Sequence, residues 1–277
     1  MASTLSGRTL FISGGSRGIG LAIALRAARD GANVALLAKT AEPHPKLEGT
    51  VFTAAEEIEA AGGTALPIVG DVRDADQVAA AVEQAAERFG GIDVCVNNAS
   101  AIDLRGTEAL DVKRFDLMHQ INVRGTFVLS RACIPHLRRG TNPHILTLSP
   151  PISLEPRWLG PHIGYTLAKY GMTLLALGLA EELREAGVRS NALWPRTLVA
   201  TAAVQNLLGG DAAMQRSRRP EVYADAAYEV LTSHRTGQAL LCEDVLKEAG
   251  VTDFARYAYV DGAELQADLY VDDVDPA

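Results

Sequence analysis

Short apolar segments alternate with alanine- and leucine-rich segments along most of the chain. Several of the short segments are apolar at every position, which is typical of strands that are covered on both faces. Strands are predicted over 9–13, 33–38, 64–69, 92–97, 144–149, 189–193 and 238–242. Helices are predicted over 18–30, 53–61, 74–89, 110–138, 164–186 and 220–232. This order predicts right-handed crossovers and a single α/β domain over residues 1–277, with a doubly wound parallel sheet of about seven strands.

A glycine-rich turn follows the first predicted strand. It reads Ser13-Gly14-Gly15-Ser16-Arg17-Gly18-Ile19-Gly20. Glycine tolerates the backbone angles of such a turn and has no side chain to keep a phosphate away from the backbone. The N-terminus of the following helix adds free N–H groups and a positive partial charge. The turn therefore predicts a Rossmann-type dinucleotide site, in which we expect contacts from Ser13, Gly14, Ser16, Arg17, Gly18, Ile19 and Gly20.

The composition excludes several classes of protein. The chain has 277 residues, 48% of them hydrophobic, and a formal net charge of −8 at pH 7. A nucleic-acid partner would need a basic face, so we expect none. Cys95, Cys133 and Cys242 are far apart in apolar contexts, which predicts free thiols in a reducing, cytoplasmic compartment. We expect no metal, because metal-ligand spacings are absent, and no membrane span, because the longest apolar stretch, around Met172–Ala180, is too short.

Three segments interrupt or extend the alternation of strands and helices. Residues 39–52 form a loop that contains proline and histidine, and residues 194–219 form a long connection after the sixth strand. A connection of that length in an α/β domain is usually functional, so we expect 194–219 to be a substrate loop or lid. Residues 243–277 form an atypical C-terminal extension, in which Asp244–Glu248 is predicted to be helical and to cover the substrate crevice or a neighbouring subunit.

Tyr165 and Lys169 are the second informative pattern, because residues four apart lie on one face of a helix. Alone, the pair would be read as a half-buried tyrosine beside a solvated lysine. Its significance comes from the polar residues that precede it in order, which are Asn97-Asn98-Ala99 after the fourth strand, Asn122 in a helix, and Ser149 and Ser153 after the fifth strand.

With these motifs, the chain resembles the short-chain dehydrogenase/reductase family over nearly its whole length. The matching positions are Ser13 where threonine is usual, the adenine-contacting pair Asp71-Val72, Asn97-Asn98-Ala99 followed by Ser100 where glycine is usual, Asn122, and the pair Tyr165 and Lys169. Residues 38–47, 149–151 and 191–195 further resemble the hydroxysteroid dehydrogenase-like protein 2 branch. Members of that branch often carry a C-terminal sterol-carrier domain, which we do not expect here.

The resemblance implies reversible hydride transfer between a nicotinamide and a carbonyl or alcohol carbon. Tyr165 would be the acid/base, and Lys169 would hold the nicotinamide ribose. Asn122 would keep a kinked helix and a water in a proton relay to Lys169. A phenol pKa near 10 would have to fall by about 3 units to be half ionised at neutral pH, and the Lys169 ammonium has the right charge to lower it.

The usual serine of this family is missing from its place. The position 13 residues before Tyr165 is Ile152, and alignment on the fifth strand puts the serine on Pro150, which cannot donate a hydrogen bond. Ser153 is the preferred substitute for polarising the substrate oxygen. Ser149 would more naturally end the strand. Ordinary loop hydrogen bonding by both serines remains the alternative.

The end of the second strand favours NADP(H) over NAD(H). NAD enzymes typically place an acidic residue there, whereas this chain has Ala38 followed by Lys39. Lys39 and Arg17 would attract a 2′-phosphate, although either can be a plain surface charge. After the sixth strand, Pro195 and Thr197 match the segment that touches the nicotinamide carboxamide, with Arg196 where glycine is usual; Thr201 lies further on.

These observations predict an NADP(H)-dependent oxidoreductase that interconverts a carbonyl and a secondary alcohol on an apolar, small-molecule substrate. The apolar preference rests on the two loops expected to line the crevice, with Ile152, Leu154, Trp158, Leu159, Leu207 and Leu208. The alternatives are an enoyl-thioester reductase and a non-catalytic NADP(H)-binding or scaffold protein. A homodimer or homotetramer through the predicted helices 110–138 and 164–186 is expected by analogy.

Overall fold

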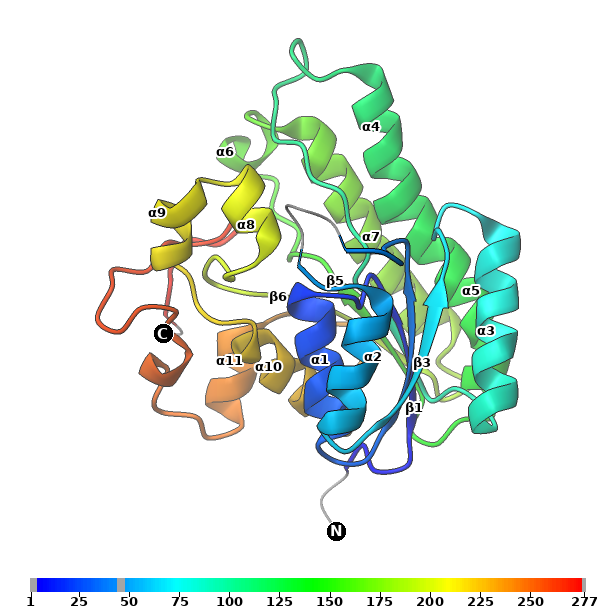
Figure 1. The fold of residues 1–277 in the computed structure, drawn as a ribbon. Coiled ribbons are helices and arrows are strands. Elements are labelled where there is room, and N and C mark those ends of the chain that lie inside the picture. Colours follow the sequence, from blue (N-terminus) through cyan, green and yellow to red (C-terminus); the bar gives the residue numbers. More distant parts are fainter. Residues whose placement is uncertain (1–3, 44–47, 276–277) are drawn as a thin grey trace.

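One parallel sheet of seven strands organises the chain, in the order β3-β2-β1-β4-β5-β6-β7 (Figure 1). The computed structural model describes residues 4–43 and 48–275. Its strands are β1 Thr9–Ser13, β2 Asn33–Ala38, β3 Thr64–Val69, β4 Val94–Asn97, β5 His144–Leu148, β6 Arg189–Trp194 and β7 Ala239–Leu241. Each predicted strand overlaps one of these, and the predicted doubly wound sheet is confirmed. Residues 44–47, which end the stretch 38–47 compared above, lie outside the described residues.

The helices differ from the predicted ones mainly where they begin and where they bend. They are α1 Gly18–Ala28, α2 Val51–Ala60, α3 Ala75–Phe89, α4 Val112–His119, α5 Gly125–Leu137, α6 Pro156–Leu159, α7 Ile163–Glu182, α8 Ala202–Leu207, α9 Gly210–Gln215, α10 Glu221–Thr232 and α11 Cys242–Glu248. Helix α2 starts two residues early because Thr50 and Thr53 form a reciprocal capping box. The predicted helix 110–138 is divided by a π-helical turn at Gln120–Arg124.

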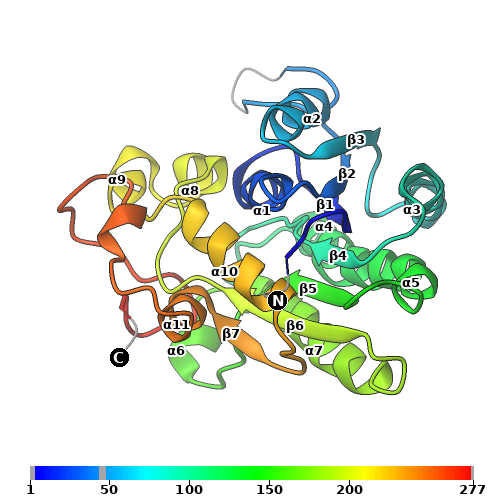
Figure 2. The same cartoon turned by 90° about the horizontal axis from the view of Figure 1, so that it is seen from below.

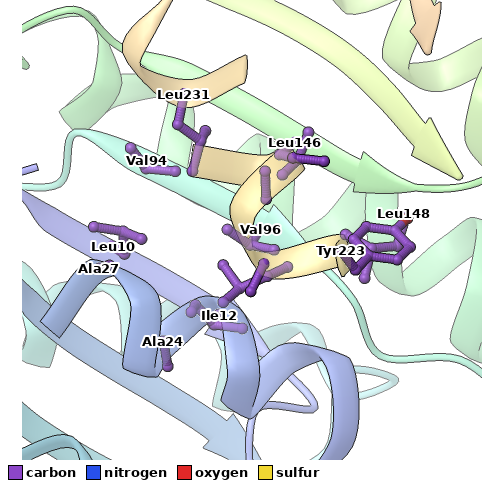
Figure 3. Close-up of a cluster of buried hydrophobic side chains, with 14 of the residues drawn as sticks. Leu10, Ile12, Ala24, Ala27, Val94, Val96, Leu146, Leu148, Tyr223 and Leu231 are labelled. Atoms are coloured by element: carbon purple, nitrogen blue, oxygen red, sulfur yellow. The ribbon is translucent and has the colours of Figure 1, made fainter. Parts of the chain in front are cut away.

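Helices cover both faces of the sheet (Figure 2). Helices α1, α2, α10 and α11 pack on one face, and α3, α5 and α7 pack on the other. Leu10 and Ile12 of β1 point to the first face, where they meet α1 and α10 (Figure 3). Phe11 between them lies in the core of the second face. This alternation explains why a strand with two covered faces is apolar at every position.

The strand order reverses between β1 and β4. The chain leaves β1 toward β2 and β3, and after returning to β4 it proceeds toward β7. Crossovers on the two sides of this point leave in opposite directions, and doubly wound sheets bind their ligands at the carboxyl ends of the strands at such a point. The glycine turn after β1 and Asn98 after β4 both lie at this point.

The predicted loop 194–219 contains the short helices α8 and α9. A second segment, residues 264–275, runs back along it, and we call this segment the C-terminal strap. The Leu198 N–H donates to Gln266 O and the Asp268 N–H donates to Arg196 O, both at about 3 Å. Helix α11 confirms the predicted helix, but its Val245 and Leu246 lie in the core of the first face. The strap, rather than α11, therefore reaches the edge of the sheet that carries the candidate site.

Among the described residues, α7 is the one helix long and apolar enough by length and composition to cross a membrane. Most of its apolar window is buried within the protein, where it packs against the sheet and carries Tyr165 and Lys169. Its apolar composition is that of a core helix.

Candidate active site

The glycine turn is a tightly closed cradle between β1 and α1. Gly14 and Gly18 have φ of +67° and +57°, which other residues adopt only with strain. A Cβ on Gly20 would lie 2.5 Å from the Asn98 amide nitrogen, so only glycine lets α1 approach this side chain. The same amide donates to Ser13 O and Gly14 O, each at 2.9 Å. Asn98 therefore ties the turn to the end of β4.

Ser13 reinforces this tie from inside the protein. Its hydroxyl accepts from the Asn98 and Ala99 N–H groups at 3.2 and 3.1 Å, and the residue is buried. Ser16 is also buried. These residues, predicted as cofactor contacts, shape the cradle from within, whereas Gly18 and Ile19 are partly exposed at its surface.

Arg17 and Lys39 lie on the side of the cradle near β2. Arg17 donates from Nε to Glu48 O at 2.9 Å and from Nη2 to Gly49 O at 2.6 Å, so its guanidinium is already engaged by the loop. Lys39 is different, because its side chain is 63% exposed and, among the described residues, it pairs with Asp71 at 3.2 Å. Of the two cations, Lys39 is the more exposed to a ligand.

Asp71 and Val72 follow β3 at the same edge of the sheet. Arg73 donates to both carboxylate oxygens of Asp71, and this guanidinium holds the pKa of Asp71 well below its usual range. Val72 is buried in the second-face core. Asp71 is therefore a fixed anion, which suits the polar edge of a nucleotide base, and Val72 is an apolar side chain, which suits its flat face.

Asn122 lies within the π-helical turn and is fully buried. Its Oδ1 accepts from the Ala101 N–H at 2.8 Å, and its Nδ2 donates to Ala101 O at 3.0 Å. The side chain thus joins the helix to the segment that follows Asn97-Asn98-Ala99. The π turn interrupts the regular helix at Asn122, and such turns are frequent at functional sites.

Lys169 is buried on α7 with its ammonium directed at the end of β5. Nζ donates to Leu148 O at 2.7 Å and lies 4.9 Å from the centre of the Trp194 ring. Burial lowers the pKa of Lys169 to about 7, against an opposing effect of the Asp268 carboxylate. Lys169 is therefore held inside the site and is not the solvated lysine that an isolated Tyr–Lys pair would predict.

Tyr165 lies one turn before Lys169 and is 4% exposed. Burial raises the pKa of its phenol well above the ordinary value, and Tyr270 and Asp268 act in the same direction. The depressed phenol pKa expected from the sequence is therefore not produced by the protein residues alone. The reason is that desolvation disfavours the phenolate and that the neighbouring strap adds groups that are neutral or negative.

The serines after β5 have distinct surroundings. Ser149 is fully buried and accepts from the Thr173 hydroxyl at 2.9 Å, as expected of a residue that ends a strand. Ser153 is partly exposed; its backbone exchanges two hydrogen bonds with the Tyr170 hydroxyl, and its Oγ accepts from the Glu155 N–H at 3.3 Å. The oxygen of Ser153 is thus used within its own turn.

The segment after β6 ends at a buried, unpartnered hydroxyl. Thr197 is fully buried and its Oγ1 has no hydrogen-bond partner in the part of the chain that the structure describes, while Pro195 nearby is also buried. Arg196, found where glycine is usual, donates from Nε and Nη2 to Asp244 at 2.8 and 3.0 Å. An arginine can replace glycine here because its side chain turns away to α11 instead of entering the crevice.

Sequence reasoning missed an aromatic cluster that is centred on Tyr270 and reaches Tyr165 through His162. It consists of Trp158, His162, Tyr165, Tyr170, Trp194 and Tyr270. Tyr270 comes from the strap with φ of +69°, and its hydroxyl lies 3.0 Å from Thr166 Oγ1. No local pattern marks Tyr270, because it meets α7 only through the path of the strap. The sequence signal for His162 was its position, three residues before the predicted catalytic tyrosine.

The residues present fit a dinucleotide. The glycine cradle has the shape that a pyrophosphate requires, and a Cβ at Gly14 would lie 3.0 Å from the Ala99 backbone. The unpartnered Thr197 hydroxyl lies in the segment predicted to meet the carboxamide. Within the described part of the chain, no cluster of three histidine, cysteine or acidic side chains could hold a metal ion, and the three cysteines are buried and free.

Known proteins resemble the chain over almost its full length. The family described as short chain dehydrogenase matches residues 8–210. Hydroxysteroid dehydrogenase-like protein 2 of Danio rerio is 55% identical over 97% of this chain, and that of Homo sapiens is 51% identical over 97%. The chain spans only 65% and 64% of the length of these two relatives.

A solved structure covers the chain more completely. The crystal structure of a short chain dehydrogenase from Mycobacterium thermoresistibile is 68% identical, with a TM-score of 0.94, over 99% of this chain and 98% of that one. The likeness extends through the strap, beyond the residues matched by the family. On these similarities and on the fold and site described above, the chain belongs to the short-chain dehydrogenase/reductase family of oxidoreductases, which use a nicotinamide cofactor.

Proposed function

We propose that the chain is an NADP(H)-dependent oxidoreductase that interconverts a carbonyl and a secondary alcohol on an apolar substrate. The observation that carries the proposal is the joint burial of Tyr165, Lys169 and Asn122 beside the glycine cradle. Asn122 and Lys169 are held by backbone groups, and the Tyr165 phenol is buried one helical turn before Lys169. A protein that only bound the cofactor would need no buried phenol at this position.

The cofactor would be held by residues from both sides of the strand reversal. The cradle at Gly14, Gly18 and Gly20 would take the pyrophosphate, with Asn98 and Ala99 behind it. Asp71 and Val72 would meet the adenine, Lys169 the nicotinamide ribose, and Pro195 and Thr197 the carboxamide. When bound, the nicotinamide supplies or accepts the hydride.

The preference for NADP(H) rests on charge at the end of β2. Ala38 gives no carboxylate to hold a ribose 2′-hydroxyl, and Lys39 is 63% exposed beside it. A 2′-phosphate would compete with Asp71 for this ammonium. Because Arg17 is bound to loop carbonyls, we assign the phosphate contact chiefly to Lys39.

Tyr165 is the proposed acid/base. Its raised pKa keeps the phenol protonated at neutral pH, which is the form that gives a proton to a substrate oxygen during reduction. Lys169 stabilises negative charge that remains on the phenol oxygen. Asn122 positions the helix through its bonds to Ala101, and Ser153 stays the serine candidate for contact with the substrate oxygen.

An apolar substrate is supported by exposed apolar side chains near the carboxyl edge of the sheet. Ile152 and Leu154 are 39% and 77% exposed after β5, and Leu207 of α8 is 60% exposed. Helices α6 and α8 both lie at this end of the molecule (Figure 1). Apolar groups that remain in water at the edge of a crevice favour a ligand that removes them from it.

We also propose a homodimer or homotetramer in a reducing, cytoplasmic compartment. Phe127 of α5 and Leu167 and Leu174 of α7 are at least 50% exposed, so these helices carry apolar surface that a second copy could cover. Light scattering after size exclusion checks this, and a monomer at all concentrations would reject the assembly. The compartment is supported by three buried free thiols.

The proposed function is tested by NADPH oxidation against ketones, aldehydes and enoyl-thioesters. Tyr165→Phe should lower kcat about 10²–10⁴-fold, because it removes the proton donor, while NADPH affinity stays within about threefold. Tyr259→Phe is the matched control, since Tyr259 is 45% exposed and outside the aromatic cluster. Full activity of Tyr165→Phe would reject the mechanism. NADPH binding without any turnover in the wild type would favour the non-catalytic alternative.

A further inference from the structure

His162 has a buried ring nitrogen that the described part of the fold does not use. It lies at the N-terminal boundary of α7, three residues before Tyr165, and is 6% exposed. Its side chain makes no capping hydrogen bond to the helix, although capping is the usual role for a polar residue there. Its Nε2 is buried and has no hydrogen-bond partner among residues 4–43 and 48–275. Buried polar atoms of this kind are rare and call for an explanation.

The surroundings of His162 fix the ring in place beside the proposed acid/base. The ring centre lies 6.3 Å from that of Tyr165 and 5.9 Å from that of Tyr270, with the Tyr270 contact near edge-on. Burial lowers the pKa of His162, so the imidazole is neutral at pH 7. A neutral imidazole has one N–H donor, and packing has already removed most of its freedom to rotate.

The positions where this family places its serine offer no equivalent donor. Pro150 and Ile152 have no side-chain donor, whereas the Ser153 Oγ accepts from the Glu155 N–H and keeps its own hydroxyl proton. Ser153 and His162 are therefore the two candidate donors of a second hydrogen bond to the substrate oxygen that accepts the proton of Tyr165. His162 is the nearby side chain with an unpartnered polar atom.

We propose that His162 donates a hydrogen bond from Nε2–H to the substrate oxygen that Tyr165 protonates. This inference rests on the proposed function and names the group that takes the place of the serine. As hydride adds to the carbonyl carbon, the π pair moves onto the oxygen, and the oxygen takes the Tyr165 proton. His162 keeps its own proton and stabilises the charge that develops before that transfer.

Two substitutions at this position separate the hydrogen bond from packing. His162→Phe keeps an aromatic ring but removes the donor, and we expect kcat for carbonyl reduction to fall about 10²–10³-fold. The KM and the NADPH affinity should change by less than about threefold, because a donor that acts on developing charge contributes mainly to the transition state. His162→Gln restores an N–H donor and should recover at least about tenfold of the lost kcat.

A matched control is available at the opposite end of the strands. His136 is 7% exposed and pairs with Glu83, and His136→Phe should leave kcat unchanged. The melting temperature of His162→Phe should equal or exceed that of the wild type, since the substitution removes an unpartnered polar atom from the interior. A lower melting temperature together with weaker NADPH binding would instead show a structural role and overturn the proposal.

Other results also decide the matter. If His162→Phe keeps kcat within about threefold of the wild type while Ser153→Ala loses it, the serine performs this role. Nitrogen NMR of the protein without substrate gives a test that needs no turnover: the proton must lie on Nε2, and a proton on Nδ1 alone would overturn the proposal. Failure of the proposed function is seen separately, as a Tyr165→Phe enzyme that is as active as the wild type.

Discussion

The glycine turn and the C-terminal strap lie at the same edge of the sheet but are held by different kinds of interaction. The turn is closed by uncharged groups, chiefly the Asn98 amide and the Ser13 hydroxyl. Charged pairs support the strap and the segments that it contacts: Arg218, itself 2% exposed, pairs with the fully buried Glu243 of α11 and with Asp275 of the strap, both at 2.8 Å. Arg196, whose carbonyl accepts a hydrogen bond from the strap, forms a two-pronged pair with Asp244 of α11.

The two regions therefore depend on their partner residues in different ways. The turn depends on close packing around its glycines. A substitution that adds atoms there cannot be compensated by a distant residue. The strap is tied through Asp275 to Arg218, whose buried pair with Glu243 is stable only while both members are present. We therefore expect damage to the strap to spare cofactor binding and damage to the turn to abolish it.

The largest effect is expected from breaking the buried ion pair. Arg218→Met leaves the Glu243 carboxylate in the interior without its cation and should lower the free energy of unfolding by about 3–5 kcal/mol. Chemical denaturation measures this, and NADPH affinity should stay within about threefold. Replacing both members with methionine should cost less than the single change. As a control, Arg184→Met breaks an exposed pair with Glu181 and should cost less than about 1 kcal/mol.

A smaller loss of stability but a larger loss of binding is expected in the turn. A Cβ in Gly20→Ala would meet the Asn98 amide at 2.5 Å and Gly14 O at 3.0 Å. The overlap should cost about 2–3 kcal/mol and weaken NADPH binding at least about tenfold, measured by fluorescence titration. Gly178→Ala is the matched control, since its Cβ would meet nothing within 4 Å and should stabilise α7 by up to about 1 kcal/mol. Equal binding by Gly20→Ala and wild type would contradict the assigned role of the cradle.

These two regions also differ in how far the sequence alone could predict them. The turn was predictable because its glycines, strand and helix are adjacent in the chain, and Tyr165 and Lys169 were predictable because a helix places residues four apart on one face. The pairing of Asp268 with Arg196 joins distant segments whose composition does not specify a partner. Tertiary packing decides such contacts, so the strap, Tyr270 and the role of Glu243 could not be predicted.

The pH dependence of the free energy of unfolding tests whether the Lys169 amine is buried. Its pKa of about 7 in the folded protein is below that of an unfolded lysine, so between pH 7 and 10 the unfolded chain binds the extra proton. Raising the pH from 7 to 9 should therefore increase the free energy of unfolding by roughly 1–2 kcal/mol through this group. Lys169→Met should lose that increase, and Lys247→Met should keep it. Identical pH profiles for Lys169→Met and wild type would contradict the buried amine.

Asp268 affects the pH dependence of stability below pH 7, whereas Lys169 affects it above pH 7. Burial raises the pKa of its carboxyl to about 7, so the folded protein holds a proton that the unfolded chain releases above about pH 4. Its contribution to stability is full at low pH and is lost as the pH rises toward 7. Asp268→Asn should remove this loss. The profile of the free energy of unfolding against pH should therefore differ from that of the wild type below pH 7 for Asp268→Asn, and above pH 7 for Lys169→Met.

The smallest effect is expected at Lys39. Lys39→Ala removes the exposed ammonium near the end of β2 and should weaken NADPH binding roughly tenfold, about 1.4 kcal/mol, with NADH affinity unchanged. Isothermal titration with both cofactors measures the ratio. Lys113→Ala, on the distant α4, controls for net charge. A parallel loss for both cofactors would show that Lys39 acts through Asp71 rather than through a 2′-phosphate.

The path of the strap has a consequence for how the protein is made. The Thr166 hydroxyl meets that of Tyr270 across 104 residues of chain. At synthesis rates of about 5–20 residues per second, α7 leaves the ribosome roughly 5–20 s before the segment that covers it. During that interval, the face of α7 that carries Thr166 and Tyr170 is uncovered and exposed to aggregation or chaperones. The newly made chain therefore has its cofactor cradle before it has the aromatic wall of its active site.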